Sequence, residues 1–267
     1  MLQYLPVVTC MTESARFTWT VVMPVKVLAR AKSRLAVLAG PRRSELALAL
    51  ASDTVCAVLA CPEVARVVVV TADPVAGPRL AALGAHVVAD EPAGGLNPAL
   101  SHGASAALAR WPGTGIAALA ADLPALRPAE LGRALRAWIP AGSTAFVADA
   151  AGVGTTLYAA PPGTAFAPRF GGASRARHAA FGGHELDLPG IPGLRRDVDT
   201  PEDLRAAVAL GVGARTASLA GELLAVLAVR RSDVRRSVVR RSDVHDRTGE
   251  RPGDSLHGLN LCGDQLA

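Results

Sequence analysis

Short apolar runs along this chain alternate with segments in which apolar residues recur every three or four positions. The runs predict strands, and the longer segments between them have the spacing of helices. In chain order they are a strand over 20–25, a helix over 45–59, a strand over 67–71, a helix over 75–83, a strand over 86–89, a helix over 100–110 and a strand over 116–120. This order predicts an α/β fold with a Rossmann-like, doubly wound, mostly parallel sheet, whose ligands lie at the carboxyl ends of the strands.

The pattern changes beyond residue 128. After a helix over 128–138, two strands over 145–149 and 155–160 flank a glycine-rich turn, which predicts a hairpin or a mixed sheet. The remaining predicted elements are a loop over 161–172, a helix over 174–181, two short edge segments and a final helix over 201–210. Thr200 suits the N-cap of that final helix, with Pro201 at its first position.

The two ends of the chain differ from its middle. We expect residues 1–17 to be an N-terminal extension, residues 18–218 to form a single domain and residues 219–267 to be a disordered tail. The sequence Val-Arg-Arg-Ser occurs three times from Val229 onward, every five residues, and such polar, low-complexity sequence cannot bury a core. An arginine arm that binds phosphate groups is the alternative for this tail.

Composition narrows the class of protein. Half of the residues are hydrophobic and only 4% are aromatic, so the core must be built from Ala, Val and Leu, which suits helices packed closely on a sheet. The formal net charge is +5, but cations are sparse outside the 26–34 segment and the tail, which argues against a nucleic-acid partner. No apolar run is as long as a membrane span, the first residues do not resemble a signal peptide, and the four cysteines lack metal-site spacing. We expect a cytoplasmic protein that binds neither nucleic acid nor membrane.

Lysine is almost absent from the chain. Only two lysines stand against 26 arginines, and both Lys26 and Lys32 closely follow the first predicted strand. Chance placement of two surface lysines is the simpler alternative. A loop in that position can instead wrap nucleotide phosphates, with the side chains of Arg30 and Arg34 beside the two lysines, although it matches neither the Walker A sequence nor the dinucleotide fingerprint.

Acidic residues and glycines follow other predicted strands. The segment that begins at Asp90 and ends at Asn97 contains Gly94 and Gly95, whose backbone can approach a flat ligand, although an ordinary loop before a helix would look the same. Asp122 directly follows a buried strand, a position suited to hold Mg²⁺ against substrate phosphates.

A second acidic segment lies near residue 198. Asp197 and Asp199 share one face if the segment is extended, so either could complete a metal site with Asp122, and Asp199 could equally cap the following helix. Hydroxyl groups and glycine amides that suit a small anion are found at Thr155, Thr156, Gly171 and Ser174.

Taken in order, these segments resemble one family. The matching motifs are Pro24-Val25-Lys26, Ala31-Lys32-Ser33-Arg34-Leu35, Asp90-Glu91-Pro92, Gly95-Leu96-Asn97, Ala121-Asp122-Leu123-Pro124, Gly154-Thr155-Thr156, Phe170-Gly171 with Ser174 and His178, and Asp197 to Leu204. On these motifs the chain from Thr18 to Gly213 resembles the 2-phospho-L-lactate or phosphoenolpyruvate guanylyltransferases of coenzyme F-420 biosynthesis. The resemblance implies a mixed, mostly parallel sheet of the nucleotide-diphospho-sugar transferase type.

The resemblance also implies an activity and a set of roles. The enzyme would transfer GMP from GTP to phosphoenolpyruvate, giving enolpyruvyl-diphospho-5'-guanosine and pyrophosphate, with Mg²⁺ as cofactor and with Lys26, Lys32 and Asp122 as catalytic residues. The residues that would bind the nucleotide are Pro24, Lys26, Arg30, Lys32, Arg34, Asp90, Gly94, Gly95 and Asn97. Of these, Asn97 and the glycine loop would recognise guanine. The resemblance implies that Thr156, Gly171 and Ser174 bind the acceptor and that Asp122, with Asp197 or Asp199, binds the metal.

Alternatives to this assignment stay open. The same chemistry could use 2-phospho-L-lactate or 3-phosphoglycerate as the acceptor. A molybdopterin guanylyltransferase is a rival, although Met23-Pro24-Val25-Lys26 departs from the glycine-rich opening loop of that group. A non-catalytic nucleotide-binding module is a rival from another class, but it would not need to keep the lysine loop and the aspartates together. The expected partners are GTP, a small phosphorylated carboxylic acid, a downstream transferase that receives the product, and a second copy of the chain in a homodimer.

Overall fold

A seven-stranded mixed sheet organises the protein. The computed structural model describes residues 17–90, 94–137, 139 and 142–225, and the sheet has the order β3-β2-β1-β4-β6-β5-β7. Its strands are β1 (Trp19–Pro24), β2 (Val64–Val70), β3 (His86–Val88), β4 (Gly115–Leu119), β5 (Ala145–Ala148), β6 (Thr155–Ala160) and β7 (His184–Glu185). All neighbouring pairs are parallel except those of β6, which runs antiparallel to β4 and β5. The predicted mixed, mostly parallel sheet is confirmed.

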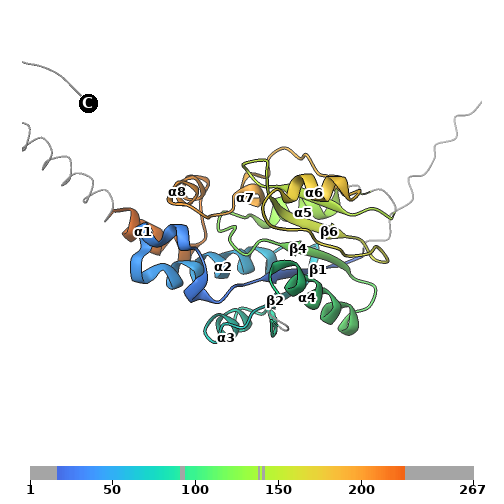
Figure 1. The fold of residues 1–267 in the computed structure, drawn as a ribbon, viewed down its shortest axis with the longest axis horizontal. Helices are drawn as coiled ribbons and strands as arrows, with labels where there is room; N and C mark the ends of the chain where they lie inside the picture. The colour runs from blue at the N-terminus through green and yellow to red at the C-terminus, as the bar shows by residue number, and fades with distance from the viewer. Residues whose placement is uncertain (1–16, 91–93, 138, 140–141, 226–267) are drawn as a thin grey trace, which may run out of the picture. The chain divides into compact units, whose positions relative to one another are not determined.

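Helices cover both faces of the sheet (Figure 1). They are α1 (Ala36–Ala39), α2 (Arg43–Leu59), α3 (Ala76–Ala81), α4 (Leu96–Arg110), α5 (Pro128–Arg136), α6 (Ser174–Ala180), α7 (Pro192–Arg195) and α8 (Pro201–Leu210), with short 3-10 turns at Leu28–Arg30, Ser33–Leu35 and Gly40–Arg42. Side chains of β1 alternate between the two layers: Val21 and Met23 pack with α2 and α5, whereas Val22 packs with α4. All three side chains are fully buried, which explains the continuous apolar run of this strand.

Helices α1, α4 and α7 differ most from the sequence prediction, which contained no helix over Ala36–Ala39. Helix α4 begins at Leu96, one turn before the predicted start at residue 100, because Gly95 at φ +101° turns the chain into the helix. Pro98 lies in the first turn, where a missing N–H costs no helical hydrogen bond. Helix α7 was not predicted. The buried carboxylate of Glu130 holds it by accepting the N–H groups of Gly193 and Leu194, at 3.2 and 2.9 Å.

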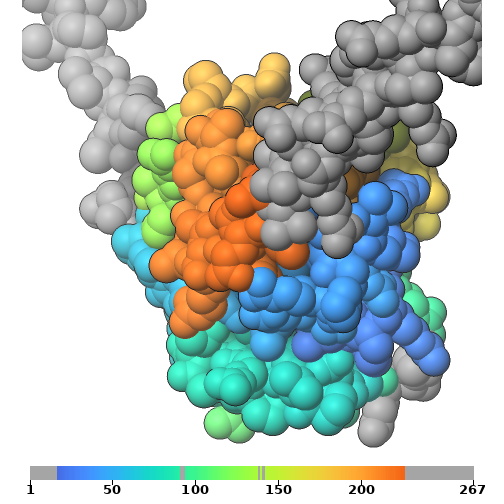
Figure 2. Space-filling model, turned by 90° about the vertical axis from the view of Figure 1, so that its left-hand side faces the viewer, coloured from blue at the N-terminus to red at the C-terminus, as the bar shows by residue number. Residues whose placement is uncertain are grey.

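The last described segment, residues 214–225, is helical and packs on α2. The buried Asp53 of α2 accepts the N–H of Thr216 at 2.7 Å, and Leu219 and Leu223 are buried. Figure 2 shows the orange C-terminal residues against the blue residues that lead into α2, where Arg42 forms an ion pair with Glu222. The predicted domain boundary at residue 218 therefore falls inside a packed helix.

The predictions for residues 1–16 and 226–267 lie outside the described residues. Within the part that the structure describes, no helix is both long enough and apolar enough to span a membrane.

Candidate functional site

A cleft with a volume of about 520 Å³ lies where β1 and β4 end. Loops at the carboxyl ends of parallel strands meet at one edge of a sheet, so residues distant in the sequence converge there. The cleft is lined by nine of the residues that the sequence predicted: Pro24, Lys26, Lys32, Arg34, Asp122, Gly171, Ser174, Asp197 and Asp199. The lysine loop (residues 26–34) and the two acidic segments, one at Asp122 and one at 197–199, therefore line one cleft.

Six predicted residues do not line this cleft: Arg30, Asp90, Gly94, Gly95, Asn97 and Thr156. Thr155 lines it in place of Thr156. The register of β5 against β6 shifts between Leu157 and Thr155, so Thr156 is left out of the pairing. Thr156 is fully buried and its hydroxyl lacks a hydrogen-bond partner. Gly94 and Gly95 are exposed next to residues 91–93, which lie outside the described residues.

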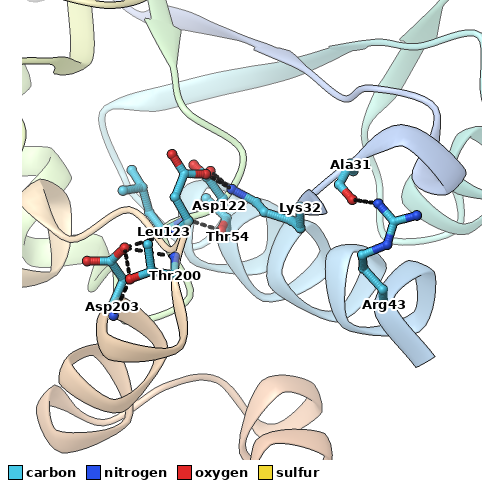
Figure 3. A network of polar contacts seen from close by, with 9 residues as sticks. Ala31, Lys32, Arg43, Thr54, Asp122, Leu123, Thr200 and Asp203 are labelled. Carbon is cyan, nitrogen blue, oxygen red and sulfur yellow. Dashed lines mark hydrogen bonds and ion pairs between the residues drawn. The ribbon is translucent and has the colours of Figure 1, made fainter. Parts of the chain in front are cut away.

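Lys32 joins the lysine loop to both acidic segments. Its ammonium donates to the carboxylate of Asp122 (Figure 3) and, at 2.9 Å, to that of Asp199. Burial alone would lower the pKa of Lys32, but the two carboxylates outweigh it and raise the pKa above its usual value. Lys32 is also the only non-glycine residue of the described ranges with a positive φ, at +54°. Such a backbone costs about 1–2 kcal/mol and is typical of functional sites held in place by their surroundings.

Two side chains hold the backbone of the lysine loop. The guanidinium of Arg43, at the start of α2, donates to the carbonyl oxygens of Ala31 at 2.6 Å (Figure 3) and of Ala29 at 2.7 Å. The carboxylate of Asp73, in the loop after β2, accepts the N–H of Leu28 at 2.7 Å. Neither residue was singled out in the sequence, because nothing local to Arg43 or Asp73 indicates a contact with this loop.

The two acidic segments are also held together by backbone contacts. Thr54 of α2 accepts the N–H of Leu123 at 3.0 Å, which fixes the loop that carries Asp122 (Figure 3). The N–H of Val198 donates to the carbonyl oxygen of Asp122 at 3.1 Å. A capping box between Thr200 and Asp203 then starts α8, as the sequence predicted for the Thr200 cap. Asp199 is therefore not the cap of this helix.

Negative charge gathers at the acidic side of the cleft. Burial, followed by the carboxylates of Asp122, Asp199 and Asp149, raises the pKa of Asp197 to about 7. Partial burial would also raise the pKa of Asp199, but Lys32 outweighs it and holds that pKa below its usual value. Asp149 was missed by the sequence analysis. It lines the cleft, and its carboxylate accepts the N–H groups of Val153 and Gly154 in the β5–β6 turn.

This donor set suits a hard divalent cation. Among the described residues, no three His, Cys, Asp or Glu side chains stand close enough together to form a complete metal cage. Mg²⁺ is commonly bound by one or two carboxylates with substrate phosphates and water as its other ligands, so a complete cage is not required. The feature that fits a cation is the convergence of Asp122, Asp197 and Asp199 on the cleft, where burial and neighbouring carboxylates raise the pKa of Asp197.

Residues 169–172, here called the glycine strap, contribute Phe170, Gly171 and Gly172 to the lining of the cleft. The Nε2 atom of His178 accepts the N–H of Arg169 at 2.9 Å, so Nδ1 carries the proton and donates to the Thr155 hydroxyl at 3.0 Å. The carboxamide of Asn97 contacts Phe170 of the strap with both its polar atoms. Sequence analysis noted His178 only as a neighbour of the motif and predicted a different role for Asn97.

Acid is expected to destabilise the protein through His178. Burial, followed by Arg177 and Arg169, lowers the pKa of this imidazole to about 4, whereas an unfolded histidine titrates near 6.5. Between these values the unfolded chain binds the extra proton, so this contribution to the free energy of unfolding falls as pH drops from about 6.5 to 4. Urea unfolding at pH 7.5 and 5.0 should show a smaller loss of stability for His178→Gln than for the wild type. Equal losses of stability in the two proteins would contradict the expected contribution of His178 to acid destabilisation.

Comparison with known proteins places the chain in a family. The MobA-like NTP transferase domain family matches residues 49–185. A phosphoenolpyruvate guanylyltransferase from Thermomonospora curvata is 62% identical over 79% of this chain and 92% of its own length. One from Streptomyces avermitilis is 60% identical over 77% of this chain and 95% of its own length.

A solved structure agrees on the fold. A protein from Desulfovibrio desulfuricans G20 assigned as a nucleotide-diphospho-sugar transferase superposes with a TM-score of 0.59, covering 80% of this chain and 97% of the other. At 16% identity this likeness supports the fold alone. The fold, the matched family domain and the two relatives agree: the chain is a nucleotidyltransferase and belongs to the phosphoenolpyruvate guanylyltransferase family.

Proposed function

We propose that this protein transfers GMP from GTP to phosphoenolpyruvate and releases pyrophosphate. The observation that carries the proposal is the cleft, which is lined by cations of the lysine loop together with carboxylates of the acidic segments and glycines of the strap. The relatives at 60–62% identity act in the same way according to their names. The role in coenzyme F-420 biosynthesis that the sequence resemblance implies stays a prediction.

The reaction requires charge neutralisation more than covalent help from the protein. An oxygen of the acceptor phosphate attacks the α-phosphorus of GTP, and the bond from that phosphorus to the oxygen bridging to the β-phosphate breaks. Pyrophosphate leaves with the electron pair. Lys26, Lys32 and Arg34 line the cleft and would bind the triphosphate and the leaving pyrophosphate, which is the main way that proteins accelerate such transfers.

Mg²⁺ is the proposed metal, held by Asp122 and by Asp197 or Asp199. When bound, it would supply positive charge to the phosphate oxygens. Lys32 pairs with both Asp122 and Asp199, and we expect its ammonium to turn toward the phosphates when nucleotide and metal enter. Such a movement suits a flexible ammonium better than a planar guanidinium.

The two substrates would occupy different places, the acceptor within the cleft and the guanine beside it. We assign the acceptor to Gly171, Ser174 and Thr155, with Thr155 in place of Thr156 because only Thr155 lines the cleft. The guanine would lie toward Gly94 and Gly95, whose exposed backbone leaves room for a flat base.

Substrate specificity is the direct test of this proposal. The purified protein should release pyrophosphate from GTP and Mg²⁺ with phosphoenolpyruvate, and mass spectrometry should detect the guanylylated product. Parallel reactions with 2-phospho-L-lactate, 3-phosphoglycerate and molybdopterin test the alternative acceptors. Absence of turnover with every acceptor would refute the proposed activity.

Arg43 should act on GTP binding through the lysine loop. Replacement by methionine removes two charge-assisted hydrogen bonds to the loop carbonyls, and we expect kcat/KM for GTP to fall about tenfold. Arg43→Lys should not restore it, since an ammonium cannot reproduce the fork that reaches two carbonyls. The neighbouring Arg42, which pairs with Glu45 and Glu222 on the surface, provides the control: Arg42→Met should leave the kinetics unchanged. Full activity of Arg43→Met would exclude this role.

A further inference from the structure

Both polar atoms of the Asn97 side chain form hydrogen bonds with one residue of the glycine strap. Its Oδ1 atom accepts the N–H of Phe170 at 2.7 Å, and its Nδ2 atom donates to the carbonyl oxygen of Phe170 at 3.1 Å. The two residues are 73 positions apart in the sequence. A double contact of this kind fixes the direction of the Phe170 backbone as well as its place, much as a neighbouring strand would.

A second side chain holds the adjacent peptide group. His178 of α6 accepts the N–H of Arg169 at 2.9 Å, and its ring meets the ring of Phe170 edge to face at a centroid distance of 5.3 Å. Side chains of two helices, α4 and α6, therefore fix two consecutive residues of the strap. Gly171 and Gly172 follow at once, with φ of +97° and +45°. Glycines are the residues with the most backbone freedom, so their amides depend on an anchored neighbour for a fixed direction.

Asn97 also connects the two segments to which the substrates are assigned. It lies two residues after Gly95, and its helix α4 contributes Leu96 and Leu100 to the same cleft that Phe170 and Gly171 line. The side chain of Asn97 is not among the cleft-lining groups. Each of its polar atoms is held by Phe170, so only the second N–H of Nδ2 and the second lone pair of Oδ1 are left for any other contact.

We propose that Asn97 is a positioning residue for the acceptor, acting through Phe170, and not the residue that recognises guanine. The inference rests on the proposed function in one respect, because it takes the strap as the acceptor wall. It assigns to Asn97 an effect on the acceptor KM, with little effect on GTP or on the preference for GTP over ATP.

Hydrogen exchange tests the contact without reference to activity. In Asn97→Ala the peptide that contains Phe170 should exchange its amide hydrogens faster than in the wild type. Asn97→Asp keeps an oxygen that accepts the Phe170 N–H but places a carboxylate beside the Phe170 carbonyl, so it should show an intermediate exchange rate. Ser101→Ala, at an exposed position on the same helix, should exchange as the wild type does. Unchanged exchange in both Asn97 variants would overturn the proposal.

Steady-state kinetics then distinguish positioning from base recognition. For Asn97→Ala we expect the KM for phosphoenolpyruvate to rise about tenfold or more, with a smaller change in kcat and an unchanged ratio of GTP to ATP use. A loss of GTP preference with an unchanged acceptor KM would overturn the proposal in favour of guanine recognition. If the wild type uses no acceptor at all, the proposed function fails, while the exchange experiment still decides whether Asn97 holds the strap.

Discussion

Asp122→Asn is expected to lower kcat for guanylyl transfer by about 10²- to 10³-fold. Asp122 lies at the carboxyl end of β4, contacts Lys32 and lines the cleft. Asparagine has nearly the same shape but lacks the charge, so it would weaken both the metal site and the attraction that places Lys32. Pyrophosphate release with GTP and phosphoenolpyruvate, followed at several Mg²⁺ concentrations, measures the loss. If Asp122 holds the metal, more Mg²⁺ should recover part of the activity.

The same substitution should leave the fold intact. The backbone contacts that fix this loop come from Val198, which donates to the Asp122 carbonyl, and from Thr54, which binds the N–H of Leu123. Neither contact uses the Asp122 carboxylate. Asp187→Asn is a matched control, since Asp187 is 96% exposed and, within the described residues, forms an ion pair with Arg195 alone. Undiminished turnover by Asp122→Asn, with the control also active, would exclude Asp122 as an essential ligand.

Much of the fold could be predicted from the sequence because its signals are local. The buried strands are short β-branched runs, such as Val67 to Val70, whose side chains alternate between two apolar layers and are almost fully buried. The start of α8 was also local, since Thr200 and Asp203 form the capping box between themselves. Helix α7 was missed because its stability comes from Glu130, more than sixty residues away.

Nine of the predicted site residues line one cleft, but the contacts between them could not be predicted. Strand order brings the loops after β1 and β4 to one edge of the sheet, so the convergence of Lys32 and Asp122 followed from topology. The pairing that makes them neighbours spans 90 positions, and no local pattern indicates it. The choice between Thr155 and Thr156 depends on an irregular pairing of β5 with β6, which leaves no mark in the sequence.

Lys32→Met is expected to lower kcat/KM for GTP by about 10²- to 10³-fold, because a nearly isosteric side chain removes the charge that would meet the phosphates. Lys32→Arg should lower kcat/KM for GTP by a smaller factor, but its activity should remain below that of the wild type. A guanidinium can bind two carboxylates firmly through its planar fork, so it would remain on Asp122 and Asp199 and leave them less readily for the triphosphate. Arg205→Met, which breaks the surface pair with Glu202, is the control and should keep full activity. Equal activity of Lys32→Arg and the wild type would refute the need for a mobile ammonium.

The pH dependence of the stability of Lys32→Met tests whether Lys32 is the counter-ion of the aspartates, which kinetic measurements do not test. Without the ammonium, Asp197 and Asp199 keep their repulsion with the neighbouring carboxylates but lose the compensating charge, so the pKa of these two groups in the folded variant should lie above the value of about 3.9 in the unfolded chain. The folded variant then binds more protons than the unfolded chain at mildly acidic pH, so its stability relative to the wild type should improve as pH falls from 8 to 5.5. Mg²⁺ at pH 8 should have the same effect if these carboxylates bind it. Thermal unfolding of the variant and the wild type at the two pH values measures this difference in stability. A loss of stability in the variant that does not change with pH or Mg²⁺ would show that Lys32 is not the counter-ion of these aspartates.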